Sequence, residues 1–352
     1  MSGNTLLSFC CVSYNHEQFI EDCIKSIWNN DYKNIEIFVL DDGSKDKSVE
    51  ILNNLKKISP CPMTIISQSN SGQIGANFNK LINMSNGDYI SIISCDDMLV
   101  ENSLNSKMQD MIANDKLAYI CHSKAIGIDK NNNKNTFVPL NDLDKIENPT
   151  ANDVLELDFN KIHSYYTQGS IYRKDILEII GLFDEDMICD DIILRTKLSR
   201  FLINNPEWQF KVLHYAGVYY RKHSTNVSQN SIRQVVGVIE YLNRYWIDRK
   251  PPKALFDWIE NVISQSNEKS EILNIFLKND YIYKILSIKN YLDMFFNNGI
   301  LYKKIGIPFV FEIKKYKKWE EKLLIIKLLN IPIFKYKKKI INKHIQKMTS
   351  IL

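Results

Sequence analysis

Residues 89–97 read YISIISCDD, an apolar run that ends in a cysteine and two adjacent carboxylates, Asp96 and Asp97. The run has the length and composition of a buried strand, and open α/β sheets bind their ligands where such strands end. Two neighbouring carboxylates repel each other unless a positive or polar group lies between them. Taken alone, the pair is equally typical of a solvated loop, in which Asp forms turns or caps a helix. The surrounding sequence decides between these two interpretations.

Strand-like and helix-like segments alternate along the first hundred residues around this stretch. Short runs rich in apolar and β-branched residues predict strands, and the amphipathic runs between them predict helices. Such alternation is typical of right-handed βαβ units, so we expect an α/β fold with a mostly parallel central sheet flanked by helices. The expected strands are 6–14, 35–40, 63–67 and 89–94, and the expected helices are 18–30, 47–57 and 75–85.

Two of the expected strands are each followed directly by a pair of acidic residues. Asp41 and Asp42 follow the second expected strand, just as Asp96 and Asp97 follow the fourth. In a doubly wound sheet both pairs lie along the same carboxyl edge, where ligands bind. No segment has a G-x-G-x-x-G or P-loop pattern, so we do not expect nucleotide binding of the dinucleotide or ATPase type.

The length and composition indicate a globular protein larger than one usual domain. The chain has 352 residues, of which 45% are hydrophobic and 24% charged, so we expect one domain of the size of a catalytic domain plus an appendage. Seven cysteines without a C-x-x-C pair argue against a disulfide framework or a structural zinc site, and favour a reducing, cytosolic setting. The pattern of a signal peptide and an apolar run of about 18 residues are both absent, so neither a signal peptide nor a spanning helix is expected.

Four stretches, taken together, resemble the family-2 glycosyltransferases with the GT-A (Rossmann-like) fold. The resemblance covers roughly the first 225 residues, with the elements in the order and spacing of that family. It implies a catalytic domain at 1–228 and the inverting transfer of a sugar from a nucleotide-diphosphate donor to a hydroxyl of a glycan, as in bacterial O-antigen or capsule synthesis. The stretches are VSYNHEQFIEDCIKSI (12–27), IEIFVLDDGSKDKSVEIL (35–52), SNSGQIGANFNKLINMSNGDYISIISCDDM (69–98) and GLFDEDMICDDIILRTKL (181–198).

The resemblance also implies a set of residues that bind the nucleotide sugar. A carboxylate at Asp41 or Asp42 would accept the uracil N–H and favour a uridine donor, whereas the alternative is that both only shape a turn. Gly72 would allow the backbone to approach a phosphate or sugar closely. Asn79 is either a ligand or a satisfied helix residue, and Phe78 stands where relatives often carry an Arg. The implied donor-binding residues are Ser13, Tyr14, Asn15, Glu17, Asp41, Asp42, Asn70, Gly72, Gln73, Asn79 and Asp96.

The family's acidic D-x-D signature is incomplete in this chain, because Ser94 stands at its first position. Asp96 and Asp97 retain the other two acidic positions, and the resemblance implies that they hold Mn²⁺ or Mg²⁺ across the diphosphate. These ions prefer oxygen ligands and take the remainder from phosphate and water. Which of the two carboxylates is the main ligand stays open. His223 is implied as a further metal ligand or diphosphate contact, and the alternative is a solvated surface histidine.

A second acidic pair, Asp190 and Asp191, precedes an apolar helical run. The pair would favour a helix N-terminus through the helix dipole alone. The resemblance instead implies that the catalytic base is the second member, Asp191, with Asp190 as the alternative; the two are expected to titrate as a coupled pair.

Residues 229–352 are expected to form a helical, basic C-terminal region. From residue 301 onward the chain has 14 Lys, no Arg and 3 acidic residues, a net charge of +11, whereas the first 300 residues carry a net charge of −7. Aromatic and aliphatic residues alternate with Lys near the end, which is typical of a segment on an anionic membrane surface. The alternative is a solvated Lys face on a helix that packs against the catalytic domain. Nucleic-acid binding is not expected, because no nucleic-acid fold is recognisable.

These features lead to one main hypothesis and two alternatives. The main hypothesis is a glycosyltransferase that acts on a glycan or lipid-diphosphate-linked acceptor and is cytoplasmic, peripheral on the inner face of the cell membrane. The first alternative is a catalytically silent protein that binds a sugar nucleotide or acts as a scaffold, and the loss of an acid at Ser94 favours it. The second is a synthase that transfers a sugar to polyprenyl phosphate, a class that normally brings spanning helices or a shorter chain.

Overall fold

The computed structural model describes residues 5–134, 142–224, 226 and 230–265. The chain divides into two compact units, Met1–Asn230 and Ser231–Leu352, and each is described by itself. The predictions for the segment after residue 265, including the contact of its basic stretch with a membrane surface, lie outside the described residues.

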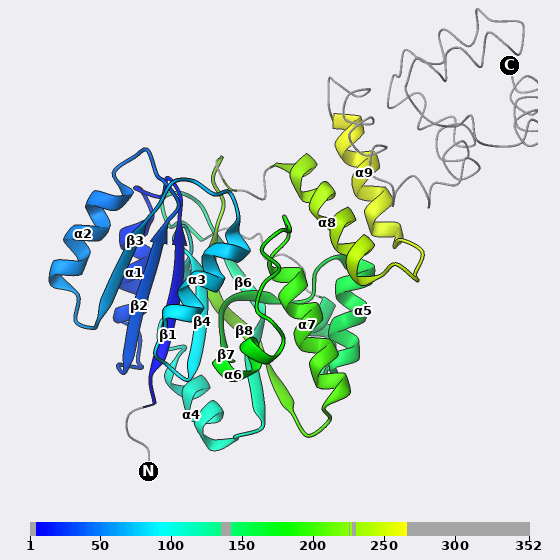
Figure 1. The fold of residues 1–352 in the computed structure, drawn as a ribbon, viewed down its shortest axis with the longest axis horizontal. Coiled ribbons are helices and arrows are strands. Elements are labelled where there is room, and N and C mark those ends of the chain that lie inside the picture. Colours follow the sequence, from blue (N-terminus) through cyan, green and yellow to red (C-terminus); the bar gives the residue numbers. More distant parts are fainter. Residues whose placement is uncertain (1–4, 135–141, 225, 227–229, 266–352) are drawn as a thin grey trace, which may run out of the picture. The chain divides into compact units, whose positions relative to one another are not determined.

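One sheet of eight strands forms the centre of the first unit (Figure 1). The strand order is β3-β2-β1-β4-β7-β6-β8-β5. β1 pairs in parallel with both β2 and β4, and β2 pairs in parallel with β3. Only β7 and β5 run against the other strands. The strands are β1 (Leu7–Ser13), β2 (Ile35–Asp41), β3 (Met63–Ser67), β4 (Tyr89–Ser94), β5 (Met98–Leu99), β6 (Leu117–Ile128), β7 (Tyr166–Arg173) and β8 (Gln209–Arg221).

The expected α/β fold with a mostly parallel sheet is confirmed, and the first four strands lie within a residue of their expected ends. β2 is buried along its whole length, because helices cover both faces of the sheet. Continuous burial explains why its sequence is apolar throughout rather than alternating.

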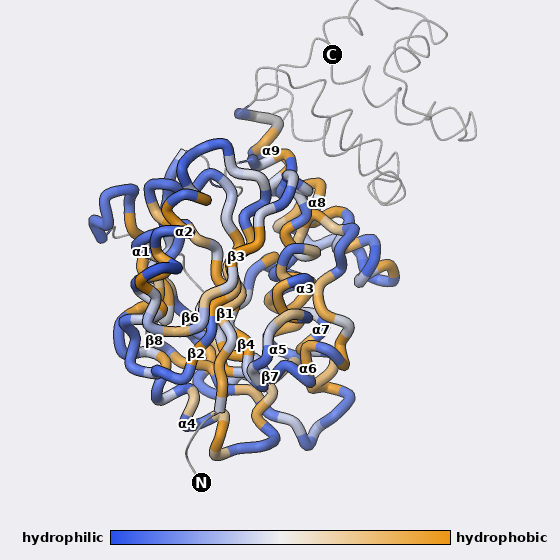
Figure 2. Tube along the Cα trace, turned by 60° about the vertical axis from the view of Figure 1, so that its left-hand side comes forward, coloured by the Kyte–Doolittle hydropathy of each residue, from blue (hydrophilic) through white to orange (hydrophobic). Residues whose placement is uncertain are grey.

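Two hydrophobic clusters lie on opposite faces of the sheet, because successive strand residues point to opposite sides. Phe9 belongs to the cluster that includes residues of α1, α2 and α4, whereas Cys10 belongs to the cluster with α3, α5, α6 and α7. Figure 2 shows the hydrophobic colour along central strands such as β1 and β2, with hydrophilic stretches in the outer loops. The helices are α1 (Ile20–Trp28), α2 (Ser48–Ile58), α3 (Ile74–Met84), α4 (Asn105–Ala113), α5 (Ala151–Lys161), α6 (Lys174–Ile179) and α7 (Asp191–Asn204).

The described part of the second unit consists of two helices that contact each other. These are α8 (Ser231–Tyr245) and α9 (Lys253–Gln265). Val235, Val238 and Leu242 are buried on one side of α8, at the three-to-four-residue spacing of an amphipathic helix.

Candidate active site

The carboxyl ends of β1, β2, β4 and β8 meet at one edge of the sheet, because these strands run in the same direction. Ser13, Asp41, Ser94 and Arg221 are the last residues of these strands. The ends of these strands and the loops that follow them therefore bring two acidic pairs and His223 to a single edge. The sequence predicted this position for both pairs, Asp41 with Asp42 and Asp96 with Asp97.

Two of these loops are joined by a set of reciprocal hydrogen bonds, which we call the loop clasp (residues 15–17 with 44–48). The backbone N–H of Asn15 donates to Ser44 Oγ over 2.8 Å, and that of Glu17 donates to Asp46 Oδ2 over 3.0 Å. In return, Asn15 Oδ1 and Glu17 Oε2 accept hydrogen bonds from the backbone N–H groups of Lys45 and Lys47. The two side chains expected to touch the nucleotide thus fix the loop geometry in this structure.

Asp41 and Asp42 are also engaged by neighbouring loops. The carboxylate of Asp41 accepts hydrogen bonds from the backbone N–H and the hydroxyl of Ser44. Asp42 accepts from Gln68 Nε2, from the N–H and hydroxyl of Ser71 and from the N–H of Gly72. Burial raises the pKa of Asp42, but these hydrogen bonds outweigh it and hold the pKa below its ordinary value.

The remaining expected donor residues fall into two groups. Tyr14 is 45% exposed, and Asn70, Gly72 and Gln73 are exposed in the loop before α3. Asn79, by contrast, is buried. Its amide donates to Phe183 O and to Glu185 Oε1, and its Oδ1 accepts from the N–H of Phe183. These bonds hold the loop that leads to the second acidic pair.

Ser13 and Asp96 each have a buried oxygen without a hydrogen-bond partner among the described residues. These atoms are Ser13 Oγ and Asp96 Oδ1. The other oxygen of Asp96, Oδ2, lies 3.1 Å from His223 Nε2 and accepts from Asn226 Nδ2 over 3.1 Å. Burial raises the pKa of Asp96, but the contact with His223 and the nearby His16 outweigh it and lower the pKa to about 2. The hydroxyl of Ser94 also lowers the pKa of Asp96. Asp96 is therefore ionised, and its Oδ1 has no partner at hydrogen-bonding distance among the described residues, a state that needs a partner.

Asp97 has a different environment from that of Asp96. Its Oδ1 accepts the backbone N–H of Arg221 over 2.8 Å, and the residue is 1% exposed. Burial and the charge of Asp96 raise the pKa of Asp97 well above its ordinary value. The Arg221 guanidinium is fully buried and donates to Asp96 O and Asp129 O. Asp97 and Arg221 together tie the turn after β4 to the end of β8.

His16, which the sequence analysis did not include among the expected site residues, lies beside the carboxylate of Asp96. Its Nε2 is 3.9 Å from Asp96 Oδ2, and its ring centroid is 6.3 Å from that of His223. Burial lowers the pKa of His16 despite the charge of Asp96. Its position within the SYNHE stretch, next to Asn15, was the only available signal.

Asp190 and Asp191 lie at the start of α7, where both carboxylates accept backbone N–H groups. Arg195 NH1 donates to Asp191 Oδ2 over 2.8 Å, and Arg195 Nε donates to the buried Asp158 over 3.0 Å. Burial raises the pKa of Asp191, but Arg195 outweighs it and holds the pKa below its ordinary value. Burial and the charge of Asp191 raise the pKa of Asp190 to about 6. Sequence reasoning missed Arg195 and Asp158; the four-residue spacing from Asp191 was a signal for the first.

Among the described residues, no three His, Cys, Asp or Glu side chains are arranged so as to hold a metal ion by themselves. The helices of the described ranges also include none that is long and apolar enough to cross a membrane.

Comparison with known proteins identifies relatives of the first unit. Residues 8–181 match the model of the family described as Glycosyl transferase family 2. Over 237 residues the chain is 25% identical to the GalNAc(5)-diNAcBac-PP-undecaprenol β-1,3-glucosyltransferase of Campylobacter jejuni, a match that covers 66% of this chain and 72% of that protein. It is 33% identical over 182 residues to the abequosyltransferase RfbV of Salmonella typhimurium, which covers 51% of this chain and only 50% of that enzyme.

The fold also resembles a solved structure. The crystal structure of S. aureus TarS 1–349 in complex with UDP-GlcNAc superposes with a TM-score of 0.51 and 15% sequence identity. The match covers 92% of this chain and 80% of that chain. At this identity the likeness concerns the fold.

Proposed function

This chain belongs to glycosyl transferase family 2, and we propose that it transfers a sugar from a nucleoside-diphosphate donor to a hydroxyl of a glycan acceptor, with inversion at the anomeric carbon. UDP is the favoured nucleotide. The Campylobacter relative, named for an undecaprenol-diphosphate-linked glycan, supports a lipid-linked acceptor in bacterial surface polysaccharide synthesis. The TarS complex with UDP-GlcNAc shows that a protein of this fold binds a uridine donor.

The unsatisfied Oδ1 of Asp96 is the observation that carries this proposal. Leaving a buried carboxylate oxygen unpaired costs free energy, so the site is built to receive a positive or hydrogen-bonding group. His223 lies 3.1 Å from the other oxygen and adds an imidazole nitrogen to the same place. A carboxylate and an imidazole fit Mn²⁺ or Mg²⁺, with diphosphate oxygens and water completing the coordination.

Asp96 and His223 would hold this ion, and Asp97 would not be its main ligand. One oxygen of Asp97 is already taken by the N–H of Arg221, and the residue is almost fully buried. When bound, the ion supplies electrostatic stabilisation of the negative charge that develops on the leaving diphosphate.

Asp191 would act as the general base that takes the proton of the acceptor hydroxyl. Its side chain is 47% exposed, and Arg195 fixes its orientation over 2.8 Å. Asp190 is the alternative base, because a pKa of about 6 makes it the stronger proton acceptor at neutral pH.

The nucleotide would lie over the loop clasp, with the exposed Tyr14 ring as a surface for the base. Ser13 lies directly before Tyr14, and its buried hydroxyl, which has no hydrogen-bond partner within the described ranges, would contact the ligand. Asn70, Gly72 and Gln73 are exposed in the loop that Asp42 closes, and would contact the phosphates or sugar.

The proposed reaction also leads to a proposal for the acceptor substrate and for the cellular location of the enzyme. A lipid-diphosphate-linked glycan would be presented at the inner face of the cell membrane, where the basic tail would contact anionic lipid. The enzyme would then be cytoplasmic and peripheral.

Calorimetry of UDP binding with and without Mn²⁺ tests the proposal. We expect Mn²⁺-dependent binding to the full chain, at least tenfold weaker in Asp96→Asn. The matched control is Asp110→Asn, which removes an exposed carboxylate that pairs with Lys211 on another part of the unit. If Asp96→Asn bound UDP as tightly as the unmodified chain in the presence of Mn²⁺, the assignment of Asp96 as a metal ligand would be wrong. If the unmodified chain did not bind UDP, the assignment of a uridine donor would be wrong, and the alternative of a catalytically silent scaffold protein would be favoured.

A further inference from the structure

A row of three aromatic rings, which we call the aromatic row (His163, Tyr166 and Tyr220), is formed by the loop between α5 and β7, the start of β7 and the end of β8. The ring centroids of His163 and Tyr166 are 5.3 Å apart in an edge-to-face arrangement, and those of Tyr166 and Tyr220 are 6.2 Å apart. All three side chains are partly exposed. Tyr166 and Tyr220 pack on the hydrophobic cluster beneath them, which gives the row a rigid base.

Arg195 links the backbone next to the aromatic row to Asp191, the expected general base. Its NH1 nitrogen donates both to Asp191 Oδ2 over 2.8 Å and to the backbone carbonyl of Tyr165 over 3.1 Å. Tyr165 directly precedes Tyr166, so a single nitrogen contacts both the carboxylate and the backbone next to the middle ring of the row. Asp158, which is fully buried, holds the same guanidinium from the other side.

The strand that carries Tyr166, the middle ring of the aromatic row, also contacts the acidic turn after β4. Gln168, two residues beyond Tyr166, accepts the backbone N–H of Ser94 over 2.7 Å. Burial raises the pKa of Tyr166, Tyr220 and Asp97 raise it further, and Arg195 lowers it. The hydrogen bond of Gln168 thus connects the strand of Tyr166 to the donor side, as the carbonyl of Tyr165 connects it to Arg195.

His163 contributes an unsatisfied polar atom to this region. Its Nε2 is buried and has no hydrogen-bond partner among the described residues. Burial and then Arg195 lower the pKa of His163 to about 4, so the ring is neutral at physiological pH. A neutral imidazole can either accept or donate a hydrogen bond, which suits a hydroxyl group.

We propose that His163, Tyr166 and Tyr220 form the surface that binds the acceptor sugar and sets which sugar is accepted. This inference rests on the proposed function. Aromatic faces pack against the apolar side of a sugar ring, while the ring nitrogen of His163 pairs with one of its hydroxyls. A site that pairs its buried polar group with a substrate hydroxyl discriminates strongly against analogues that lack this hydroxyl. The link through Arg195 to Asp191 would bring another hydroxyl of the same sugar to the base.

Saturation-transfer NMR with methyl glycosides of hexoses and N-acetylhexosamines tests this inference. The spectra are recorded on the full chain with UDP and Mn²⁺ present. We expect saturation of at least one glycoside, and a dissociation constant about tenfold higher in Tyr166→Leu and His163→Phe. The conservative variant Tyr166→Phe should retain most of the binding, because it keeps the ring. The matched control is Tyr215→Leu, which removes a ring that is 46% exposed elsewhere on β8.

Two donor-side readouts separate this inference from the proposed function. UDP binding by calorimetry and hydrolysis of a UDP-sugar in the absence of acceptor should be unchanged in Tyr166→Leu and His163→Phe. Unchanged glycoside binding in both variants, or no saturation of any glycoside in the unmodified chain that binds UDP, would overturn the aromatic row as the acceptor surface. Loss of UDP binding in the unmodified chain would instead overturn the proposed function.

Discussion

Asp190 and Asp191 are neighbours at the start of α7, but their carboxylates have opposite environments. Asp191 pairs with Arg195, whereas burial and the charge of Asp191 raise the pKa of Asp190. Removal of a general base typically costs about 10²–10⁴ in rate. We therefore expect Asp191→Asn to lower kcat by that factor while UDP binding by calorimetry is retained.

The isosteric variant Asp190→Asn is the control for this prediction. It keeps the hydrogen bond at the helix start, because an amide oxygen also accepts the N–H of Asp191. If kcat fell more in Asp190→Asn than in Asp191→Asn, the general base would be Asp190 and not Asp191.

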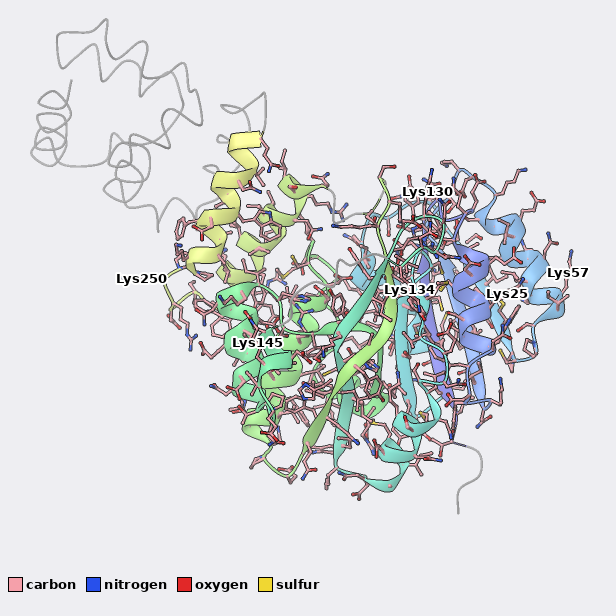
Figure 3. All side chains as sticks on the ribbon, turned by 180° about the vertical axis from the view of Figure 1, so that it is seen from behind. Lys25, Lys57, Lys130, Lys134, Lys145 and Lys250 are labelled. Atoms are coloured by element: carbon pink, nitrogen blue, oxygen red, sulfur yellow. The ribbon has the colours of Figure 1, made fainter. Side chains whose placement is uncertain are left out.

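Lys107 is fully buried, in contrast to surface lysines such as Lys57 and Lys145 that Figure 3 labels. Its ammonium nitrogen lies 2.7 Å from Gly169 O and 3.1 Å from His122 Nε2. The other ring nitrogen of His122 lies 3.2 Å from the carbonyl of Tyr215, so it carries the hydrogen and leaves Nε2 to accept from Lys107. Burial lowers the pKa of Lys107 from 10.5 to about 7.

This low pKa makes stability depend on pH. Between about pH 7 and 10.5 the unfolded chain holds a proton on Lys107 that the folded protein has lost, so the free energy of unfolding rises with pH. The penalty for burying the lysine is complete below pH 7 and is relieved as pH rises. Relative to Lys107→Met, we expect the native chain to gain up to about 1.4 kcal/mol per pH unit in urea unfolding between pH 7.5 and 9.5.

Lys57→Met serves as the control, because Lys57 is exposed on α2. Its stability should stay parallel to that of the native chain over the same pH range. A constant difference between the native chain and Lys107→Met would mean that Lys107 is not buried as a neutral amine.

At the scale of elements, the loop clasp joins the end of β1 to the start of α2. Asn15 has a φ of 57°, in the left-handed region, and its Oδ1 accepts the N–H of Lys45 over 2.7 Å. Asn tolerates this backbone conformation better than most residues, whereas Ala does not. The clasp therefore depends on one residue for both its backbone shape and its side-chain bond.

Two substitutions separate these contributions. Asn15→Gly loses only the hydrogen bond, and we expect a loss of about 1 kcal/mol in the free energy of unfolding. Asn15→Ala adds the left-handed strain and should lose about 1–2 kcal/mol more. Urea unfolding measures both, with Asn54→Ala on the exposed side of α2 as the control. Equal stability of the Gly and Ala variants would contradict the role of the backbone conformation.

β8 shows how one element positions several site residues. Between its pairings with His122 and Lys124 of β6, β8 contains one residue more than β6, which forms a bulge. The carbonyl of Tyr215 at this bulge accepts a hydrogen bond from His122. A Cβ at Gly217 would lie 2.1 Å from the His122 ring, so only glycine fits there. Bulges redirect the strand beyond them. Here the strand continues to Arg221, which holds the acidic turn.

At the scale of the whole molecule, the residues of the proposed site lie within the first unit, Met1–Asn230. The strongly basic stretch from residue 301 onward belongs to the second unit. Each basic residue near an anionic membrane contributes roughly 1 kcal/mol to binding. We therefore expect the chain to bind vesicles that contain phosphatidylserine, and a chain shortened after Asn230 to lose this binding but keep UDP binding.

Vesicle sedimentation at low and high salt measures this binding. Vesicles of phosphatidylcholine alone are the control, and added salt should weaken binding to the anionic vesicles. Equal binding of both vesicle types, or retention by the shortened chain, would contradict the role of the basic tail.

The sequence predicted much of the fold, because the relevant signals are local. Alternating apolar and amphipathic runs gave β1 to β4 and α1 to α3 nearly to the residue. The acidic pairs were also placed correctly at the strand ends, since parallel strands bring their carboxyl ends to one edge. The direction of β7, which runs against β4, was not predicted, because no local signal states which way a later strand returns.

The roles within the site depend on partners that are distant in the sequence. Asp96 and Asp97 are chemically identical neighbours. Asp96 contacts His223, and its Oδ1 has no hydrogen-bond partner in the described part of the chain, whereas Asp97 accepts the N–H of Arg221, 124 residues away. Arg195 joins Asp158 to Asp191 only because α5 and α7 pack together.

By itself, therefore, the sequence determined which segments form the sheet, which edge holds the carboxylates and which family the chain resembles. Only the tertiary structure decided which carboxylate oxygen has no partner among the described residues, which of the expected donor-binding residues fix loops and which aromatic rings pack against one another. The physical reason is that hydrophobic periodicity acts between near neighbours along the chain, whereas hydrogen-bond saturation and pKa depend on whatever side chain the fold brings within a few ångströms.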